Sequence, residues 1–399
     1  MRKALTILAL ATLAWSADTH PKVRAITAFI NLEPKSLPTQ IEDTAKFLNA
    51  ARDTYRKAGF EVETIRIVTQ PFPRYIAGMK HDDALTLFRT FDSLAGKLGF
   101  TPNMGPAMVS DSDEFSLDLI TEVLATTRIN ASIVTASEDG IHWRAIRESA
   151  RLIKALSIRS PRSRGNFNFA TASMLKPYTP FFPAAWHNGP GRTFAVGLEG
   201  ANVVADIFSR YHDPREAEQQ LTTALTKHLK EAETTAKSVA ASSGWIYAGT
   251  DPTPAPLGDV SIGAAIEAFT GAPFGGPGTM TAAAIITRAV QAVPIQRTGY
   301  AGLMVPVLED NLLAKRWGEG TYTRDSLLAY SAVCATGLDT VPLPGDITEE
   351  QIARILGDVA SLAWKWQKPL AARLLPVPGK KAGDHTDFED SRMANTVLH

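Results

Sequence analysis

The chain has 399 residues, in which 41 Lys and Arg residues balance 41 Asp and Glu residues, so its formal net charge is zero. Without a net field to attract nucleic acid or an anionic membrane surface, the chain is expected to bind a small molecule. Its hydrophobic fraction of 45% and charged fraction of 21% are typical of a globular protein with a large core. Cys334 is the only cysteine, which excludes an intramolecular disulfide and any cysteine-rich metal site.

Residues 1–17 have the pattern of a signal peptide. Arg2 and Lys3 precede a short apolar run, and the small residues Ser16 and Ala17 end it. The run is too short to span a bilayer, and no other stretch is long and apolar enough to do so. We therefore expect a protein that is secreted or periplasmic. The alternative is an uncleaved apolar extension on a cytoplasmic protein.

From Lys22 onward, short β-branched runs alternate with helical patterns, which predicts an α/β fold with mostly parallel strands. In chain order, strands are expected at 23–30, 61–67, 131–136, 166–172, 193–198, 245–248, 302–307 and 372–375. Helices are expected at 40–58, 82–98, 114–126, 142–156, 201–208, 214–242, 261–269, 279–290, 324–335 and 349–366. No linker divides the chain, so we expect one domain over residues 22–384 and a polar surface tail, partly disordered, over 385–399.

Four acidic residues lie in or beside glycine-rich turns of the C-terminal half. Glu199, Asp251 and Glu309 each follow an expected strand, and Asp339 lies in a turn after an expected helix. If they converge on one site, they must share a proton or bind a hard cation such as Mg²⁺ or Ca²⁺, because clustered carboxylates cannot all stay ionised in a cleft. The alternative is that each caps a helix, since Glu199 and Asp310 both directly precede helical stretches.

A glycine-rich loop and a basic segment are candidates for holding a substrate anion. The loop runs straight into a helix, whose N-terminal N–H groups favour negative charge. Its candidate anion-binding residues are Gly275, Gly276, Gly278 and Thr279. A plain tight turn explains the same loop. Arg373 stands within an apolar run, where an arginine normally needs a carboxylate partner, and Lys380 follows it in a surface turn.

Several blocks of the chain, in this order, resemble one family, the uncharacterised DUF711 family, also known as UPF0210. The resemblance extends from Val23 to about Asp384. The strongest blocks are 166–170, 179–185, 197–202, 298–310, 330–346 and 373–384. This resemblance implies a fold similar to that of pyruvate formate-lyase, a single large α/β barrel with finger loops entering its centre. It implies no established reaction.

The implied fold is shared with glycyl-radical enzymes, which raises a specific hypothesis. The segment Arg297-Thr298-Gly299-Tyr300-Ala301 looks like a radical-glycine loop, with Cys334 as the thiyl partner. In those enzymes the glycine follows the cysteine and lies near the C-terminus, whereas Gly299 precedes Cys334. Because a fold can be shared without its chemistry, we do not expect radical chemistry.

The preferred interpretation is an enzyme that acts on a small polar or anionic metabolite by acid–base or cation-assisted hydrolysis or lyase chemistry. The proposed acid/base or cation-binding groups are Glu199, Asp251, Glu309 and Asp339. Arg373 and Lys380 would orient an anion. The alternative is an exported solute-binding or scaffold protein without turnover. Clustered, perturbed carboxylates favour the enzyme, whereas an aromatic pocket with charges only at its rim favours the binder. A homo-oligomer is left open.

Overall fold

The structure, a computed structural model, describes residues 20–334 and 336–399. The expected signal peptide therefore lies outside the described residues. The strands are β1 (Lys22–Ile30), β2 (Val62–Thr69), β3 (Thr101–Pro106), β4 (Asn130–Ser137), β5 (Gly140–Ile141), β6 (Phe169–Ser173), β7 (Thr193–Glu199), β8 (Ile246–Asp251), β9 (Gly337–Pro344) and β10 (Leu370–Val377).

One or two helices separate most neighbouring strands in the chain, as the sequence pattern predicts, whereas four helices of the described chain lie between β8 and β9. The helices are α1 (Leu37–Lys57), α2 (Pro73–Ile76), α3 (His81–Leu98), α4 (Leu117–Thr126), α5 (Trp143–Arg159), α6 (Arg164–Phe167), α7 (Ala201–Phe208), α8 (Pro214–Ser243), α9 (Ile262–Thr270), α10 (Thr279–Ala292), α11 (Asn311–Gly318), α12 (Arg324–Ser331) and α13 (Glu349–Trp366). Two short 3₁₀ turns cover Pro34–Ser36 and Pro161–Ser163. No helix among the described residues is long and apolar enough to cross a membrane.

The longest helix, α8, shows how local sequence sets these boundaries. Asp213 caps its start, where the carboxylate accepts hydrogen bonds of 3.0 Å from the N–H groups of Arg215 and Glu216. Pro214 occupies the first turn, and Gly244 ends the helix in the left-handed conformation. Its buried residues include Leu221, Leu225, Leu229, Ala232 and Ala236, a spacing that places them on one face against the core.

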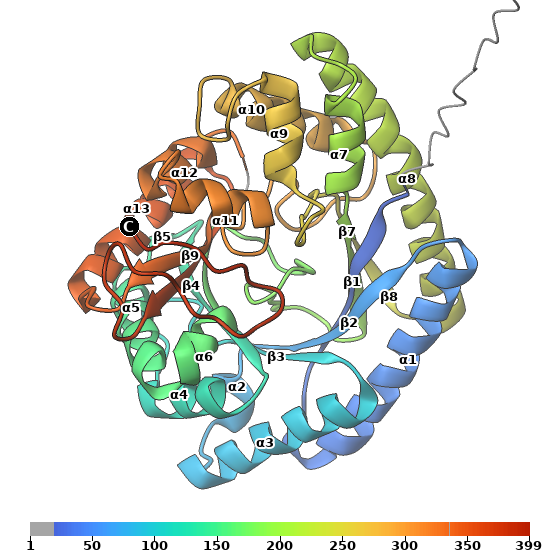
Figure 1. Cartoon of the computed structure of the whole chain (residues 1–399). Coiled ribbons are helices and arrows are strands. Elements are labelled where there is room, and N and C mark those ends of the chain that lie inside the picture. Colours follow the sequence, from blue (N-terminus) through green and yellow to red (C-terminus); the bar gives the residue numbers. More distant parts are fainter. Residues whose placement is uncertain (1–19, 335) are drawn as a thin grey trace, which may run out of the picture.

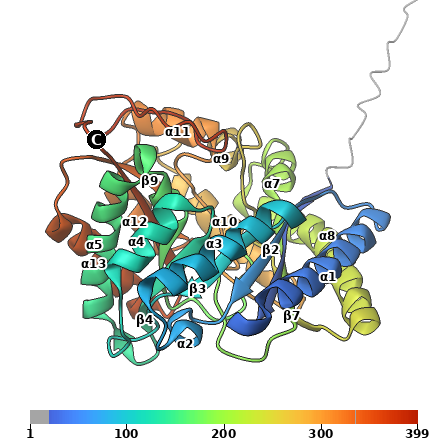
Figure 2. The same cartoon turned by 90° about the horizontal axis from the view of Figure 1, so that it is seen from below.

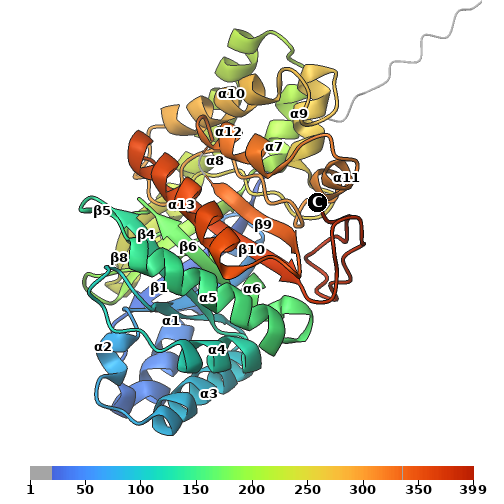
Figure 3. The ribbon, with the colours of Figure 1, turned by 90° about the vertical axis from the view of Figure 1, so that its left-hand side faces the viewer.

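All strands belong to one mixed sheet, so the α/β prediction is confirmed. The strand order is β8-β7-β1-β2-β3-β4-β6-β10-β9, and β5 pairs with β4. The strands β1, β2, β3, β4 and β6 form a parallel block, whereas β7 and β10 each join it in antiparallel pairing. The helices lie on the outside of this curved sheet, and irregular segments occupy the middle (Figure 1). In the view from below, α1 and α3 lie side by side, with α1 packed against β2 and α3 packed against β3 (Figure 2). On another side α5 and α13 cover β10 (Figure 3).

The strands at the two edges of this sheet, β8 and β9, do not pair with each other, so the expected closed barrel is not confirmed. The edge strands β8 and β9 are linked instead by one irregular segment, through the isolated bridges Thr250–Arg297 and Pro306–Asp339. The strand expected at 302–307 is wrong. There the N–H groups of Gly302 and Leu303 donate to the hydroxyls of threonines, at 3.3 and 3.2 Å, rather than to a neighbouring strand.

The polar C-terminal tail is folded, which corrects the expectation of partial disorder. The N–H of Ala394 donates to the carbonyl of Leu308 at 2.7 Å, and the hydroxyl of Thr396 donates to the carbonyl of Ala314 at 2.6 Å. Leu398 is fully buried. The tail therefore packs against α11 and the segment before it.

Candidate functional site

A cavity of about 420 Å³ opens where β1 and β2 begin, against the irregular segment that links the sheet edges. Side chains on one face of a strand recur every second residue, so Thr64 and Arg66 of β2 both reach this cavity. The aromatic residues in its wall are Phe167, Phe181, Phe182 and Tyr300. The volume suits a small metabolite.

Arg24, near the start of β1, gathers three carboxylates at one side of the cavity. One guanidinium nitrogen donates to Glu63 Oε2 at 3.1 Å and to Glu199 Oε2 at 3.0 Å. Glu199 comes close because it pairs with Lys22 across the antiparallel β1–β7 ladder. The other nitrogen of Arg24 lies 3.8 Å from Glu309 Oε1. Arg24 thus links the carboxylates of three separate segments.

Arg373, in the middle of β10, forms the second centre of charge. Its Nε donates to Asp339 Oδ1 at 2.8 Å, and an Nη atom donates to Glu309 Oε2. The guanidinium carbon also lies 4.8 Å from the ring centroid of Phe167, a cation–π distance. Asp339 lies within β9 and not in a turn after a helix, which corrects the sequence expectation. Glu309 contacts both arginines, so the two charge centres form one network.

Burial makes ionisation of the acids in this network unfavourable. Burial raises the pKa of Glu199 to about 7, against the opposing effect of Arg24, and a hydrogen bond and like charge from Glu63 raise it further. Burial likewise raises the pKa of Asp339 despite the opposing charge of Arg373. For Arg373 itself, the charges of Asp339 and Glu309 outweigh burial and raise its pKa. Glu199 is therefore partly protonated near neutral pH.

Arg66 is the cation of this cavity that stands apart from the ion-pair network. Its side chain is 9% exposed, and among the described residues no carboxylate forms an ion pair with it. Its Nε donates to the hydroxyl of Thr64 at 3.0 Å, and the guanidinium lies 4.9 Å from the ring centroid of Phe182. Burial and the nearby charge of Arg24 lower its pKa to about 9. A second guanidinium nitrogen donates to the carbonyl oxygen of Pro180 at 3.4 Å, so Arg66 is a desolvated cation whose hydrogen-bond partners carry no charge.

Asp251 does not join the other acids but holds a loop of the cavity wall. Its carboxylate accepts hydrogen bonds from the N–H groups of Tyr300 and Ala301, at 2.8 and 3.1 Å, and from Thr253. Burial raises its pKa to about 6, against these hydrogen bonds. Gly299 approaches the carboxylate so closely that a Cβ would lie 2.0 Å from Oδ2. Asp251 thus positions Tyr300, which lines the cavity.

The helix-cap alternative applies to Asp310 and not to Glu199. Asp310 accepts hydrogen bonds from Leu312 and Leu313 at the start of α11, and from Ile262 and Gly263 at the start of α9. No side chain caps α7, the helix that follows Glu199. Asp310 is therefore structural, whereas Glu199 belongs to the charge network.

The structure does not bring the glycine-rich loop or Lys380 to the cavity. Lys380 lies 3.9 Å from Asp387 outside the cavity wall. The loop packs elsewhere: a Cβ on Gly275 would lie 2.2 Å from the carbonyl oxygen of Thr321. Thr279 accepts the N–H of Gly275 at 3.1 Å, so the tight-turn interpretation fits this loop. None of Gly275, Gly276, Gly278 and Thr279 lines the cavity.

Arginines supply the balancing charge of the acids in the charge network, for which a shared proton, a hard cation or a basic partner, Arg373, was expected from the sequence. Within the described part of the chain, the acids of the cavity do not provide three ligand atoms close enough together to share an ion. Arg24 and Arg66 were not predicted from the sequence. Both stand in apolar strands, as Arg373 does, so an arginine within an apolar run would have indicated them too. Arg392 was not predicted either, since it lies in the tail and gives no such signal.

Comparisons with known proteins agree with the resemblance read from the sequence. Residues 17–390 match the family described as "Uncharacterised ACR (DUF711)". A UPF0210 protein of Desulforudis audaxviator is 31% identical over 365 residues, which cover 86% of this chain and 80% of that protein. A UPF0210 protein of Pyrobaculum arsenaticum is 29% identical, over 92% of this chain and 87% of that protein. One from Neisseria meningitidis is 28% identical, over 86% and 79%.

Proposed function

Because the chain belongs to the DUF711 (UPF0210) family, we propose one function for it from its cavity: an enzyme that acts on a small anionic metabolite by acid–base chemistry. Hydrolysis and lyase-type cleavage both need a proton donor or acceptor beside a bound substrate. The observation that carries the proposal is Arg66, which is buried in the cavity wall without a carboxylate partner among the described residues and lies near acids of raised pKa.

Arg66 would bind the anionic group of the substrate. A buried cation without a carboxylate partner is costly, and a ligand carboxylate or phosphate would relieve that cost through charge-assisted hydrogen bonds. The ring of Phe182, which already stacks on the guanidinium, would keep water from one side of this contact. Specificity for an anion thus follows from the charge that the protein leaves unpaired.

The pair formed by Glu63 and Glu199 would move the proton. Glu63 lines the cavity, and Glu199 lies behind it with a pKa of about 7. A group with such a pKa exchanges its proton readily at neutral pH, which is what a general acid or base requires. Glu309 and Asp339 would hold Arg373 in the opposite wall, where Tyr300 faces the substrate.

The test uses a panel of small carboxylates and phosphate monoesters, screened by thermal shift and then by proton NMR for turnover. We expect Arg66→Met to weaken binding of the stabilising compound about 10–100-fold, the worth of one charged hydrogen bond. The control is Arg147→Met, because Arg147 is exposed on α5. Equal binding by wild type and Arg66→Met would refute the anion site.

A second arm separates the enzyme from the rival, an exported solute-binding protein without turnover. Glu63→Gln should keep binding but lose product formation, since the amide cannot exchange a proton with the substrate. A compound that binds tightly to wild type and stays unchanged through prolonged incubation would favour the binder. The aromatic residues Phe181 and Phe182 in the wall give that rival some support.

We also propose that the fold is similar to the pyruvate formate-lyase barrel, that the chemistry uses no glycyl radical, and that the protein is exported. An open sheet whose edges are linked by an irregular segment is compatible with the barrel of pyruvate formate-lyase-like proteins. Neither Gly299 nor Cys334 lines the cavity, which supports chemistry without a glycyl radical. Export of the protein stays a proposal that rests on residues 1–17.

A further inference from the structure

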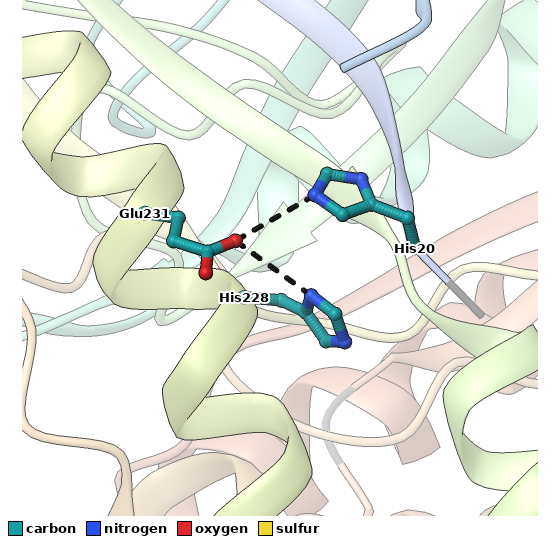
Figure 4. A group of neighbouring side chains, drawn as sticks. All are labelled: His20, His228 and Glu231. Atoms are coloured by element: carbon teal, nitrogen blue, oxygen red, sulfur yellow. Dashed lines mark ion pairs between the residues drawn. The ribbon is translucent and has the colours of Figure 1, made fainter. Parts of the chain in front are cut away.

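A second group of chemically active side chains lies away from the cavity. His228 and Glu231 stand three residues apart on one face of α8, and His20 comes from the chain just before β1 (Figure 4). One ligand atom from each residue lies within 4.8 Å of the others. None of the three residues lines the cavity, so this group is a site separate from the one that carries the proposed function.

The distances within the group suit a shared metal ion better than direct hydrogen bonds. Glu231 Oε2 lies 3.6 Å from His20 Nε2 and 4.0 Å from His228 Nδ1. Hydrogen bonds between such atoms are about 2.7–3.2 Å long. Two ligand atoms at about 2.0 Å from one tetrahedral zinc ion are separated by roughly 3.3 Å. To reach that value the two separations from Glu231 would shorten by about 0.3 and 0.7 Å, and the separation between the two histidine ligand atoms, which is at most 4.8 Å, by no more than about 1.5 Å.

Contacts on both elements fix these side chains in place. The carbonyl oxygen of His20 accepts a hydrogen bond of 3.2 Å from the side-chain amide of Asn202. The imidazole ring of His20 packs edge-on against the ring of Phe60, with centroids 4.3 Å apart. The His228 ring lies 5.1 Å from the His20 ring. The side chains are 30% exposed for His20, 7% for His228 and 48% for Glu231. An ion could thus enter from the Glu231 side.

We propose that His20, His228 and Glu231 form a zinc site with its fourth position open to water. Two imidazoles and one carboxylate are ligands that Zn²⁺ prefers, whereas Mg²⁺ and Ca²⁺ take oxygen ligands only. The bound ion would fasten the segment before β1 to α8. Because Arg24 lies only four positions after His20, this fastening would also steady one wall of the cavity.

The test uses the full chain without a polyhistidine tag, freed of metal by a chelator and titrated with Zn²⁺ against a chromogenic competitor. We expect one equivalent of zinc to bind and to raise the melting temperature. Glu231→Gln should weaken zinc affinity at least 10-fold, and His228→Ala at least 100-fold. Glu231 is half exposed, so its variant should fold even if His228→Ala does not.

The matched control is His81→Ala. His81 forms a surface pair with Glu122 at 3.2 Å, and this pair is not part of a three-ligand group among the described residues. Its variant should bind zinc like wild type, and Mg²⁺ should neither bind nor shift the melting temperature. The proposal is overturned if wild type binds no zinc at micromolar concentration, or if Glu231→Gln and His81→Ala bind it equally, which would mean adventitious binding only.

Discussion

Replacing Glu199 by glutamine should stabilise the protein at alkaline pH. The amide oxygen can still accept a hydrogen bond from Arg24, and the amide N–H can donate to Glu63 in place of the proton of the Glu199 carboxyl group. The variant would thus keep the contacts of the protonated carboxyl group but would no longer titrate. Near pH 5, where Glu199 is protonated in the folded protein, wild type should be less stable than the variant by only about 1 kcal/mol.

The magnitude follows from the shift of the carboxyl pKa from 4.5 to about 7. The folded state holds this proton more tightly than the unfolded state, so the stabilisation is present below pH 4.5 and is lost as the pH rises through 7. At about 1.4 kcal/mol per pKa unit, this difference in proton binding lowers the free energy of unfolding of wild type by about 3 kcal/mol at pH 8 and by about 1 kcal/mol at pH 5. Glu199→Gln should remove this difference of about 2 kcal/mol.

The assay is urea unfolding, followed by tryptophan fluorescence at pH 5 and pH 8 for each protein. Linear extrapolation gives the free energy of unfolding at each pH. Glu138→Gln serves as the control, because Glu138 is exposed in the turn between β4 and β5. The reasoning is refuted if Glu199→Gln keeps the pH dependence of wild type. It is equally refuted if the variant is less stable than wild type at pH 8, since Glu199 would then be a required anionic partner of Arg24.

Four further outcomes are expected. Asp310→Ala should lower the free energy of unfolding by about 2–4 kcal/mol in urea unfolding, because it removes the caps of two helices. Arg373→Met should lower the free energy of unfolding by about 3–5 kcal/mol at pH 7 in the same assay and by less at pH 5, because the buried carboxyl group of Asp339, whose pKa burial already raises, loses its cation and protonates more readily. Gly299→Ala should lower the melting temperature, since its φ of 74° is left-handed and its Cβ would meet the Asp251 carboxylate. Intact mass of the protein from its native host should show cleavage within residues 14–17, and full-length protein in the cytosol would end the export proposal.

Periodicity predicted most helices well, because their apolar residues follow one face. The expected helix at 349–366 is α13, and the one at 82–98 differs from α3 by one residue. Strands were harder to predict. The sequence of β3, Thr-Pro-Asn-Met-Gly-Pro, contains the residues that strands usually avoid, and only its pairing with neighbours makes it extended. Residues 302–307 were predicted to be a strand because their residue types favour one. In the structure they are irregular, and backbone N–H groups in this segment donate to threonine hydroxyls.

Several residues of the site could be predicted from the sequence, but the contacts between its acids and arginines could not. Acids that end strands indicated a site, and Arg373 in an apolar run indicated a buried ion pair. Which acid meets which arginine depends on the register of segments that are distant in sequence, and a single sequence does not specify it. Asp251 illustrates this limit, because its turn looks like that of Glu199 although its partners are backbone N–H groups.

The charge network also determines when the protein acquires its cavity during synthesis. Glu199 meets Arg24 across 175 positions of the chain, and Arg373 meets Glu309 across 64. Arg24 leaves the ribosome long before Glu199 and Glu309, and Glu309 is synthesised before the strand that carries Arg373. Charges without their partners favour water over a core, so the nascent chain keeps this region hydrated and open. Contacts of such long range form slowly, so we expect the cavity to be completed late in folding.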